Sequence, residues 1–404
     1  MEAADAAVWQ GAVLGGIVIW LVTASLLDLT LKLRSFLQPW VSHHVEIGIP
    51  IILQIQNYHS CSMDAFFSGL SCVVSVPFYT GFLPLLFWSG HGKLARQMTL
   101  LIAFCDYFGN CIKDVVSAPR PPSPPVKRIT ATKDEEDNAL EYGLPSSHTL
   151  NTVCLSGYLL HYVLNHTQIE GAYATTHIGL SLVVLLVTLI AFGRVYLGMH
   201  SVIDIIAGLL FGLGILAFWL SVDDYIDNFV ISGQNVTSFW AGLSFLLLFA
   251  YPTPEIPTPS FEYHTCFNGV ALGIVTGVQL TYHQFHTEFV PRLFTSDMKI
   301  LVFAGRVLVG IPTILIVKFC SKALAKWTIP VVANTLGIPI KSSSYIPKLN
   351  PLVTGNKPKE GCFQRLLGSQ DSFDVDTGIR FIQYTGLAWS VVDLVPTLFT
   401  YLSL

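Results

Sequence analysis

Residues 177–220 read HIGLSLVVLLVTLIAFGRVYLGMHSVIDIIAGLLFGLGILAFWL. This stretch contains two apolar runs, 177–197 and 200–220, and each has the length of about 20 residues that a helix needs to cross a bilayer. Ionisable side chains lie where the first run ends and the second begins: Arg194, His200 and Asp204. Charges at membrane depth are costly, so they mark candidate functional groups. The stretch therefore predicts two membrane helices with a polar site at their junction.

The whole chain has the composition of a membrane protein. Of its 404 residues, 52% are hydrophobic and 12% are charged, and the mean hydropathy is +0.57. Soluble domains carry about 25% charged residues, so lipid must cover much of this surface. The net charge is −4, and no basic stripe is interleaved with aromatic residues. This pattern argues against a nucleic-acid partner and indicates the bilayer as the main partner.

Further apolar runs predict an all-α fold, a polytopic integral membrane helical bundle of about ten spans. The expected spans, with approximate boundaries, are 11–31, 66–89, 97–116, 149–165, 177–197, 200–220, 237–255, 265–283, 299–320 and 378–403. Segment 44–58 is short and polar, and we expect it to lie in the interface or to re-enter the membrane.

We divide the chain into three parts. Residues 1–65 hold an N-terminal span and the interfacial segment, 66–220 form the core that carries the candidate site, and 221–404 add further membrane helices with a basic loop. Two stretches interrupt the membrane pattern. In 117–147 repeated prolines stop a helix and a dense cluster of charges follows, and 321–377 is rich in lysine.

Three groups of polar residues close or open neighbouring spans: Lys113 with Arg120; Ser146, Ser147 and His148; and Arg194, His200 and Asp204. Span 97–116 ends near the first group, and loop 117–147 stays on that side until the second. Span 149–165 then crosses away, and 177–197 returns to the third. Topology alone therefore places all three groups on one membrane face.

The chemistry of this set fits a phosphate ester. His200 and Asp204 are four residues apart and share a helix face, so Asp204 can fix the tautomer of an imidazole whose other nitrogen attacks. His148 is available as a general acid or base. The residues suited to hold a dianion are three cations and two serines at a helix start: Lys113, Arg120, Arg194, Ser146 and Ser147.

Each member of the set also has a simpler interpretation. Lys113 and Arg120 fit interfacial snorkelling charges, Arg194 and Asp204 a structural ion pair, and the two serines an ordinary N-cap. His148 alone is more typical of a satisfied polar residue. The coincidence of all three groups on one face favours the catalytic interpretation. The set contains no carboxylate cluster for a metal, so we expect neither a metal nor another cofactor.

The ordered spacing Lys113-x6-Arg120-Pro121, Pro145-Ser146-Ser147-His148 and Arg194-x5-His200-x3-Asp204 resembles the three signature motifs of the type 2 phosphatidic acid phosphatase (lipid phosphate phosphatase) superfamily. The resemblance implies that His200 is the nucleophile and forms a phosphohistidine. It also implies that His148 protonates the leaving alkoxide and later helps to activate water, while Asp204 orients His200. The residues that would hold the phosphoryl oxygens are Lys113, Arg120, Ser146 and Arg194.

Two positions depart from the superfamily pattern. Ser147 stands where glycine is usual, although its backbone N–H remains available to phosphate, and Gly193 stands where serine is common. The sequences around the three motifs resemble those of the sphingoid long-chain-base phosphate phosphatases: KDVVSAPRPPSPPV, EYGLPSSHT and GRVYLGMHSVIDIIAGLLFG. That branch implies a phosphorylated sphingoid lipid as substrate and the endoplasmic reticulum membrane as location. Asp114 and Glu141 are candidate partners for the ammonium of such a substrate.

Other functions remain open at the level of sequence. One is a phosphatase of another membrane substrate, such as phosphatidic acid, a polyprenyl diphosphate or a sugar phosphate. Another is a lipid transporter or scramblase whose buried charges line a polar path. A transporter is expected to show interrupted helices near the bilayer midplane and inverted repeats, and the sequence shows neither.

The distribution of basic residues does not agree on which side of the membrane carries the site. Lys93 and Arg96 on the opposite face favour a luminal site, whereas the basic residues of 117–147 and 321–377 favour a cytosolic one. The resemblance implies a luminal site, and the acidic residues in 117–147 offset its basic ones, so we expect a luminal site. The sequons at Asn165 and Asn235 would then face the cytosol and stay unmodified.

Overall fold

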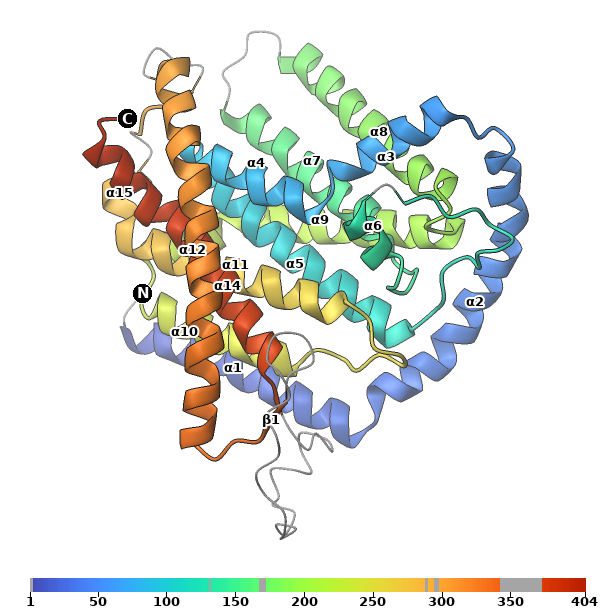
Figure 1. Cartoon of the computed structure of the whole chain (residues 1–404), viewed down its shortest axis with the longest axis horizontal. Coiled ribbons are helices and arrows are strands. Elements are labelled where there is room, and N and C mark those ends of the chain that lie inside the picture. Colours follow the sequence, from blue (N-terminus) through green and yellow to red (C-terminus); the bar gives the residue numbers. More distant parts are fainter. Residues whose placement is uncertain (1–2, 131, 167–171, 288–289, 294–297, 342–372) are drawn as a thin grey trace.

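The computed structural model describes residues 3–130, 132–166, 172–287, 290–293, 298–341 and 373–404. These residues are mostly helical and include very little strand, which confirms the expected all-α class (Figure 1). The helices are α1 (Ala3–Leu26), α2 (Leu29–Gln56), α3 (Cys61–Cys72), α4 (Val76–Trp88), α5 (Gly92–Val116), α6 (Lys133–Asn138), α7 (Ser147–His166), α8 (Ala172–Tyr196), α9 (Val202–Ser232), α10 (Val236–Phe249), α11 (Ser260–Phe285), α12 (Ile300–Thr335), α14 (Val375–Val392) and α15 (Leu394–Tyr401). Two short strands, β1 (Ile340–Lys341) and β2 (Phe373–Asp374), pair in parallel.

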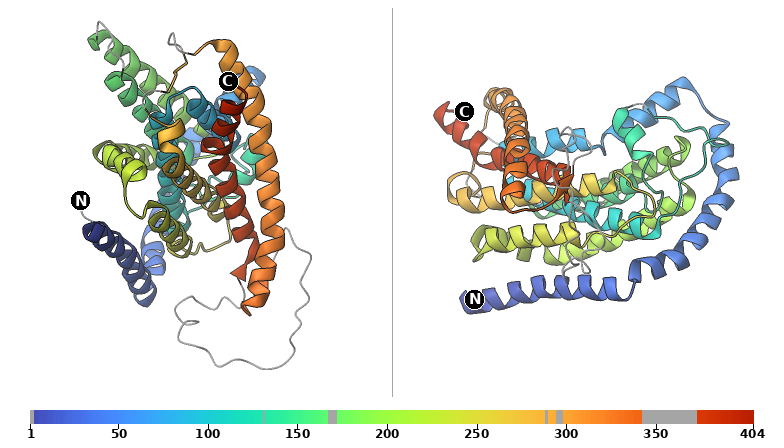
Figure 2. Two further views of the ribbon diagram at one scale, coloured as in Figure 1. Left: turned by 90° about the vertical axis from the view of Figure 1, so that its left-hand side faces the viewer. Right: turned by 60° about the horizontal axis from the view of Figure 1, so that its bottom comes forward.

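Helix α5 lies at the centre of the bundle in Figure 1. Helices α7 and α9 pack against each other and against α5, and α11 packs on α5 as well. Helix α14 contacts both α11 and α12, and the left panel of Figure 2 shows α12 and α14 as two long helices side by side. Helix α5 therefore joins the group that carries the candidate site to the C-terminal helices.

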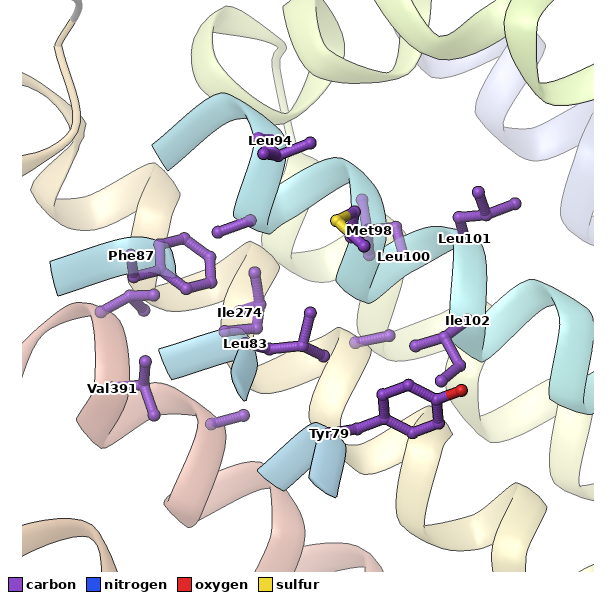
Figure 3. Close-up of a cluster of buried hydrophobic side chains, with 14 of the residues drawn as sticks. Tyr79, Leu83, Phe87, Leu94, Met98, Leu100, Leu101, Ile102, Ile274 and Val391 are labelled. Atoms are coloured by element: carbon purple, nitrogen blue, oxygen red, sulfur yellow. The ribbon is translucent and has the colours of Figure 1, made fainter. Parts of the chain in front are cut away.

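A buried hydrophobic cluster makes this connection (Figure 3). Its members include Tyr79, Leu83 and Phe87 of α4, Leu94, Met98 and Ile102 of α5, Ile274 of α11 and Val391 of α14. The indole Nε1 of Trp88 also donates a hydrogen bond to the Val391 carbonyl oxygen at 3.1 Å. The C-terminal helices thus support α4 and α5, which both reach the candidate site.

The structure contains fewer clear membrane spans than the sequence suggested. Four helical segments in the described part of the chain are long and apolar enough to cross a membrane: Ala7–Leu26, Thr176–Tyr196, Val202–Ser232 and Ile300–Thr335. Helices α3 and α4, bent by 51° at a short break, make a fifth if they count as one span. The expected number of about ten spans is therefore not confirmed.

Two physical features account for this difference. The expected spans 66–89 and 378–403 are each broken, the first between Cys72 and Val76 and the second at Asp393. In addition, helices such as α5 and α7 carry polar side chains that point into the bundle, among them Asn110, Lys113, Asp114 and Thr152. These helices gain their stability from neighbouring helices as well as from an apolar surface.

Most of segment 44–58 forms the second half of the continuous helix α2 and is not a separate element of the fold. The polar residue Gln56 at the end of this helix makes hydrogen bonds to two other segments. The Gln56 amide donates to the carbonyl oxygens of Lys127 at 2.7 Å and Tyr196 at 3.1 Å, and it accepts from the Lys127 backbone N–H at 2.9 Å. Helix α2 therefore holds loop 117–147 against the end of α8.

Small residues let α9 approach α7 closely. Gly208 and Gly212 are spaced as in the GxxxG patterns of packed membrane helices. A Cβ atom on Gly208 would lie 2.9 Å from the Ser146 carbonyl oxygen, and one on Gly212 would lie 3.0 Å from the Val153 Cβ. The starts of these two helices, which carry His148 and Asp204, are therefore held together by backbone contact.

We expect Gly208→Ala to lower both stability and activity, because the added methyl group must push the start of α7 away from α9. Overpacking of this kind costs about 1–3 kcal/mol. The matched control is Gly214→Ala on the same helix, where a Cβ meets no atom within 4 Å. The unfolding midpoint in detergent should fall for Gly208→Ala and stay constant or rise for Gly214→Ala. Equal midpoints would contradict the close packing.

Candidate active site

Segments that are far apart in the sequence meet at one small cavity, with a volume of about 50 Å³. Six of the eight residues predicted from the sequence line it: Lys113, Arg120, Ser147, His148, Arg194 and His200. The other two, Ser146 and Asp204, are fully buried beside the lining residues. The structure thus brings the three groups of residues together at one end of the bundle.

The Arg120 guanidinium connects these segments. Helix α5 ends at Val116, and its C-cap Ser117 has a φ of 52°, in the left-handed region, three residues before Arg120. Arg120 donates to four acceptors: the Glu141 carbonyl at 2.8 Å, the Met199 carbonyl at 2.6 Å, the Asn138 carbonyl at 2.7 Å and the His200 Nε2 at 3.0 Å. A planar guanidinium supplies these donors in a fixed arrangement that a lysine cannot reproduce.

Two glutamates neutralise the buried cations. The Lys113 Nζ, on a residue that is 1% exposed, pairs with the Glu141 carboxylate. The Arg194 Nη1 lies 3.7 Å from the Glu135 carboxylate and donates to the Ser71 hydroxyl at 2.7 Å. Buried charges need such partners, because an isolated charge in a low-dielectric interior is very costly.

Part of the Arg194 guanidinium nevertheless remains available to donate hydrogen bonds. Its Nε and Nη2 atoms are buried, and neither has a hydrogen-bond partner in the described structure. An unpaired buried N–H group is costly, so most such groups in proteins find a partner. Two parallel N–H donors of one guanidinium match the oxygens of a carboxylate or phosphate. The arrangement is therefore suited to bind a tetrahedral anion.

The tautomer of His200 follows from its neighbours. A guanidinium can only donate, so in the Arg120 Nη1 contact the His200 Nε2 is the acceptor and carries the lone pair of the ring. The hydrogen then sits on Nδ1, which lies 3.6 Å from the Asp204 carboxylate. Burial lowers the pKa of His200 well below its ordinary value, and the nearby Arg120 and Arg194 charges lower it further. The imidazole is therefore neutral at pH 7.

The pair His200 and Asp204 forms in a different way from the one expected. His200 precedes α9 instead of lying on its face, because Ser201 is the N-cap of that helix. Asp204 faces the imidazole because it closes a capping box, accepting from the Ser201 backbone N–H at 2.7 Å. The cap therefore holds the Asp204 carboxylate beside the imidazole, with one oxygen 3.6 Å from the His200 Nδ1.

The two serines differ in placement. Ser147 lines the cavity at the first residue of α7. The Ser146 hydroxyl accepts from the Thr149 hydroxyl at 3.1 Å, and its backbone N–H donates to the Asp204 carbonyl at 3.0 Å. Ser146 thus caps α7 and ties it to α9, as the simpler interpretation of this residue suggested.

The two departures from the superfamily pattern also have a structural context. A Cβ atom on Gly193 would lie 2.8 Å from the ring of Phe67 on α3, so a side chain there requires that this ring shift. The hydroxyl of Ser71, on the same helix as Phe67, already accepts from Arg194. Helix α3 therefore both excludes a larger residue at position 193 and supports the Arg194 guanidinium.

The structure adds residues that the sequence motifs did not single out. Asp106, Asn110 and Asn151 line the cavity, together with Asn138 at the end of α6 and with Glu141, which the sequence offered only as a partner for the substrate ammonium. Helical spacing carried the signal: Asp106 is two turns before Lys113, and Asn151 is one turn after His148. Asp114, one of the expected ammonium partners, instead accepts from the hydroxyls of Tyr251 at 2.7 Å and Thr258 at 3.1 Å.

Comparisons with known proteins agree with this geometry. Residues 94–227, which contain all eight predicted site residues, match the PAP2 superfamily. The chain is 68% identical to lipid phosphate phosphatase delta of Arabidopsis thaliana, over 98% of this chain and 97% of that protein. It is 28% identical to a dihydrosphingosine 1-phosphate phosphatase of Schizosaccharomyces pombe, over 92% and 91%. It is 24% identical to sphingosine-1-phosphate phosphatase 2 of Homo sapiens, over 87% and 80%. No solved structure matches the chain.

Proposed function

Because the chain belongs to the PAP2 superfamily, we propose that it is a membrane phosphatase that hydrolyses sphingoid long-chain-base 1-phosphates to the free base and inorganic phosphate. One observation carries the proposal. A single cavity is lined by two histidines and three buried cationic side chains, and Arg194 among them keeps two N–H groups unpaired.

In the first step the His200 Nε2 lone pair attacks phosphorus. The N–P bond forms while the ester P–O bond breaks, and the electron pair of that bond stays on the alkoxide. His148, buried in the first turn of α7, donates a proton to this alkoxide. The product of the step is a phosphohistidine and the free sphingoid base.

In the second step His148 takes a proton from water, and the resulting hydroxide attacks phosphorus. The N–P bond breaks, its electron pair returns to the His200 Nε2, and inorganic phosphate leaves. Asp204 keeps the Nδ1 hydrogen directed toward itself through both steps, so the same nitrogen acts each time.

The cations supply the electrostatic stabilisation. Lys113, Arg120 and Arg194 line the cavity where negative charge develops, and all three side chains are buried. A bound phosphoryl group competes with Glu135 and Glu141 for these cations. It also competes for the Arg120 Nη1, which releases the His200 lone pair. This charge set needs no metal ion for the reaction.

The walls of the cavity support an amphiphilic substrate. Its apolar side includes Val74, Val76, Tyr79 and Phe267, and the first two flank the break between α3 and α4. A lipid can place its phosphate among the cations while its chain follows this apolar side. Each buried methylene contributes about 0.8 kcal/mol, so the chain dominates recruitment.

The substrate class rests on the relatives. Those with names that state a substrate act on dihydrosphingosine or sphingosine 1-phosphates. We also place the protein in the endoplasmic reticulum membrane with a luminal site, as the sequence resemblance implies.

The first test addresses the chemistry. We expect His200→Ala to abolish turnover and His148→Ala to lower it by about 10²–10⁴-fold, as is typical of general acid–base catalysis. Asp204→Asn should leave partial activity, because it weakens the orientation of His200 without removing the nucleophile. Vanadate should inhibit and EDTA should not, in assays of phosphate release by the purified protein.

His43→Ala is the control, because His43 is exposed on α2 and lies outside the cavity. Full activity of His200→Ala, or a strict requirement for a divalent ion, would contradict the mechanism.

The second test addresses the substrate. In mixed micelles at equal surface fraction, we expect dihydrosphingosine 1-phosphate to be hydrolysed with a higher kcat/KM than phosphatidic acid. Glucose 6-phosphate, which has no chain for the apolar wall, should be far slower. A higher kcat/KM for phosphatidic acid would overturn the sphingoid assignment and leave only a general lipid phosphatase.

A further inference from the structure

The cavity contains two buried acceptor atoms that have no donor. They are the Asp106 Oδ2 on α5 and the Asn151 Oδ1 on α7, and both residues line the same cavity as Lys113 and His148. Neither atom has a hydrogen-bond partner in the described part of the chain. A buried carboxylate oxygen and a buried amide oxygen both require a donor, so their position in one cavity indicates a ligand that supplies donors.

The surroundings of Asp106 leave one oxygen free for a ligand. The Asn110 amide, one turn along α5, donates to the Asp106 Oδ1 at 2.9 Å and contacts the Ser260 carbonyl oxygen at 3.4 Å. No ion pair to Asp106 occurs among the described residues, whereas the nearby cation Lys113 is paired with Glu141. The carboxylate is thus held in one orientation, with its second oxygen unsatisfied.

The helical geometry places these acceptors next to the phosphate-binding end. Asp106 precedes Lys113 by seven residues on the same face of α5, an axial rise of about 10 Å between the Cα atoms. Long helical side chains lean toward the helix N-terminus, so the Lys113 ammonium lies closer to Asp106 than its Cα does. Asn151 is three residues after His148 on the same face of α7, and α7 packs against α5.

Building on the proposed function, we propose that Asp106 and Asn151 form an ammonium subsite that selects substrates with a protonated amine one carbon beyond the phosphate-bearing carbon. An ammonium group carries three N–H donors and a positive charge. It satisfies both free acceptors and neutralises the Asp106 carboxylate. The sphingoid 1-phosphates carry this amine at C2, so the phosphate and the ammonium occupy neighbouring parts of one cavity.

The other acidic residues near the cavity are already engaged. Glu141 pairs with Lys113, and the two oxygens of Asp114 accept from Tyr251 and Thr258. Glu135 lies beside Arg194. Of the two acidic residues among the described cavity-lining residues, Asp106 and Glu141, Asp106 is therefore the one with a buried, unpaired oxygen for a cationic ligand.

The test compares two substrates of equal chain length in mixed micelles: dihydrosphingosine 1-phosphate and its 2-deamino analogue, which has hydrogen in place of the amine. The wild-type protein should prefer the amine. In Asp106→Asn, which keeps the shape of the side chain, the ratio of the two kcat/KM values should fall by about 10- to 100-fold, as expected for a lost charge-assisted hydrogen bond.

The matched control is Asp114→Asn, which removes a charge from another aspartate on the same helix, one that is fully buried and whose oxygens are satisfied by other residues. It should leave the ratio unchanged. Asn151→Leu removes the second acceptor and should lower the ratio by a smaller factor, which keeps the test available if Asp106→Asn fails to fold.

The outcomes separate this proposal from the one on which it rests. A wild-type protein that hydrolyses neither substrate contradicts the proposed function. A wild-type protein that hydrolyses both equally, with a ratio that Asp106→Asn and Asn151→Leu leave unchanged, overturns the ammonium subsite and leaves the phosphatase intact. An equal fall in the ratio for Asp114→Asn also overturns the subsite, because the effect would then follow from any lost charge on α5.

Discussion

The hydrogen bonds of the Arg120 guanidinium hold the candidate site together. They join the loop after α5, the segment before α7 and the turn before α9, and they reach the nitrogen that we propose as nucleophile. Three parts of the chain that are remote in sequence are therefore fixed relative to one another by one side chain. The close contact of Gly208 with the Ser146 carbonyl adds a second, steric constraint on the same helix starts.

Charge compensation is the second organising feature. Lys113, Arg120 and Arg194 are buried, and Glu135 and Glu141 from loop 117–147 lie beside them. These acidic residues neutralise the buried cations when no substrate is bound. In the reaction that we propose, a phosphate dianion must displace them from the cations. The same loop carries the acids and Arg120, so the phosphate binding that we propose is coupled to the position of this loop.

The sequence predicted the helical class and the residues that gather at the cavity, because span lengths and strict motif spacing are local properties. It did not predict the breaks at 73–75 and 393 or the continuity of α2, since these depend on how neighbouring helices pack. It also overlooked Asp106 and Asn151, and it proposed Asp114 as an ammonium partner. Only the three-dimensional contacts reveal that Asp114 is satisfied and that Asp106 is not.

The central claim is that His200 becomes covalently phosphorylated during turnover. Its most direct test is rapid quenching in alkali of the protein with substrate labelled in the phosphoryl group, followed by mass spectrometry of its peptides. The account predicts a transient phosphate on the peptide that contains His200, stable in alkali and labile in acid, and absent from His200→Ala. A protein that turns over substrate with no label on His200, or with the label on another residue, would contradict it.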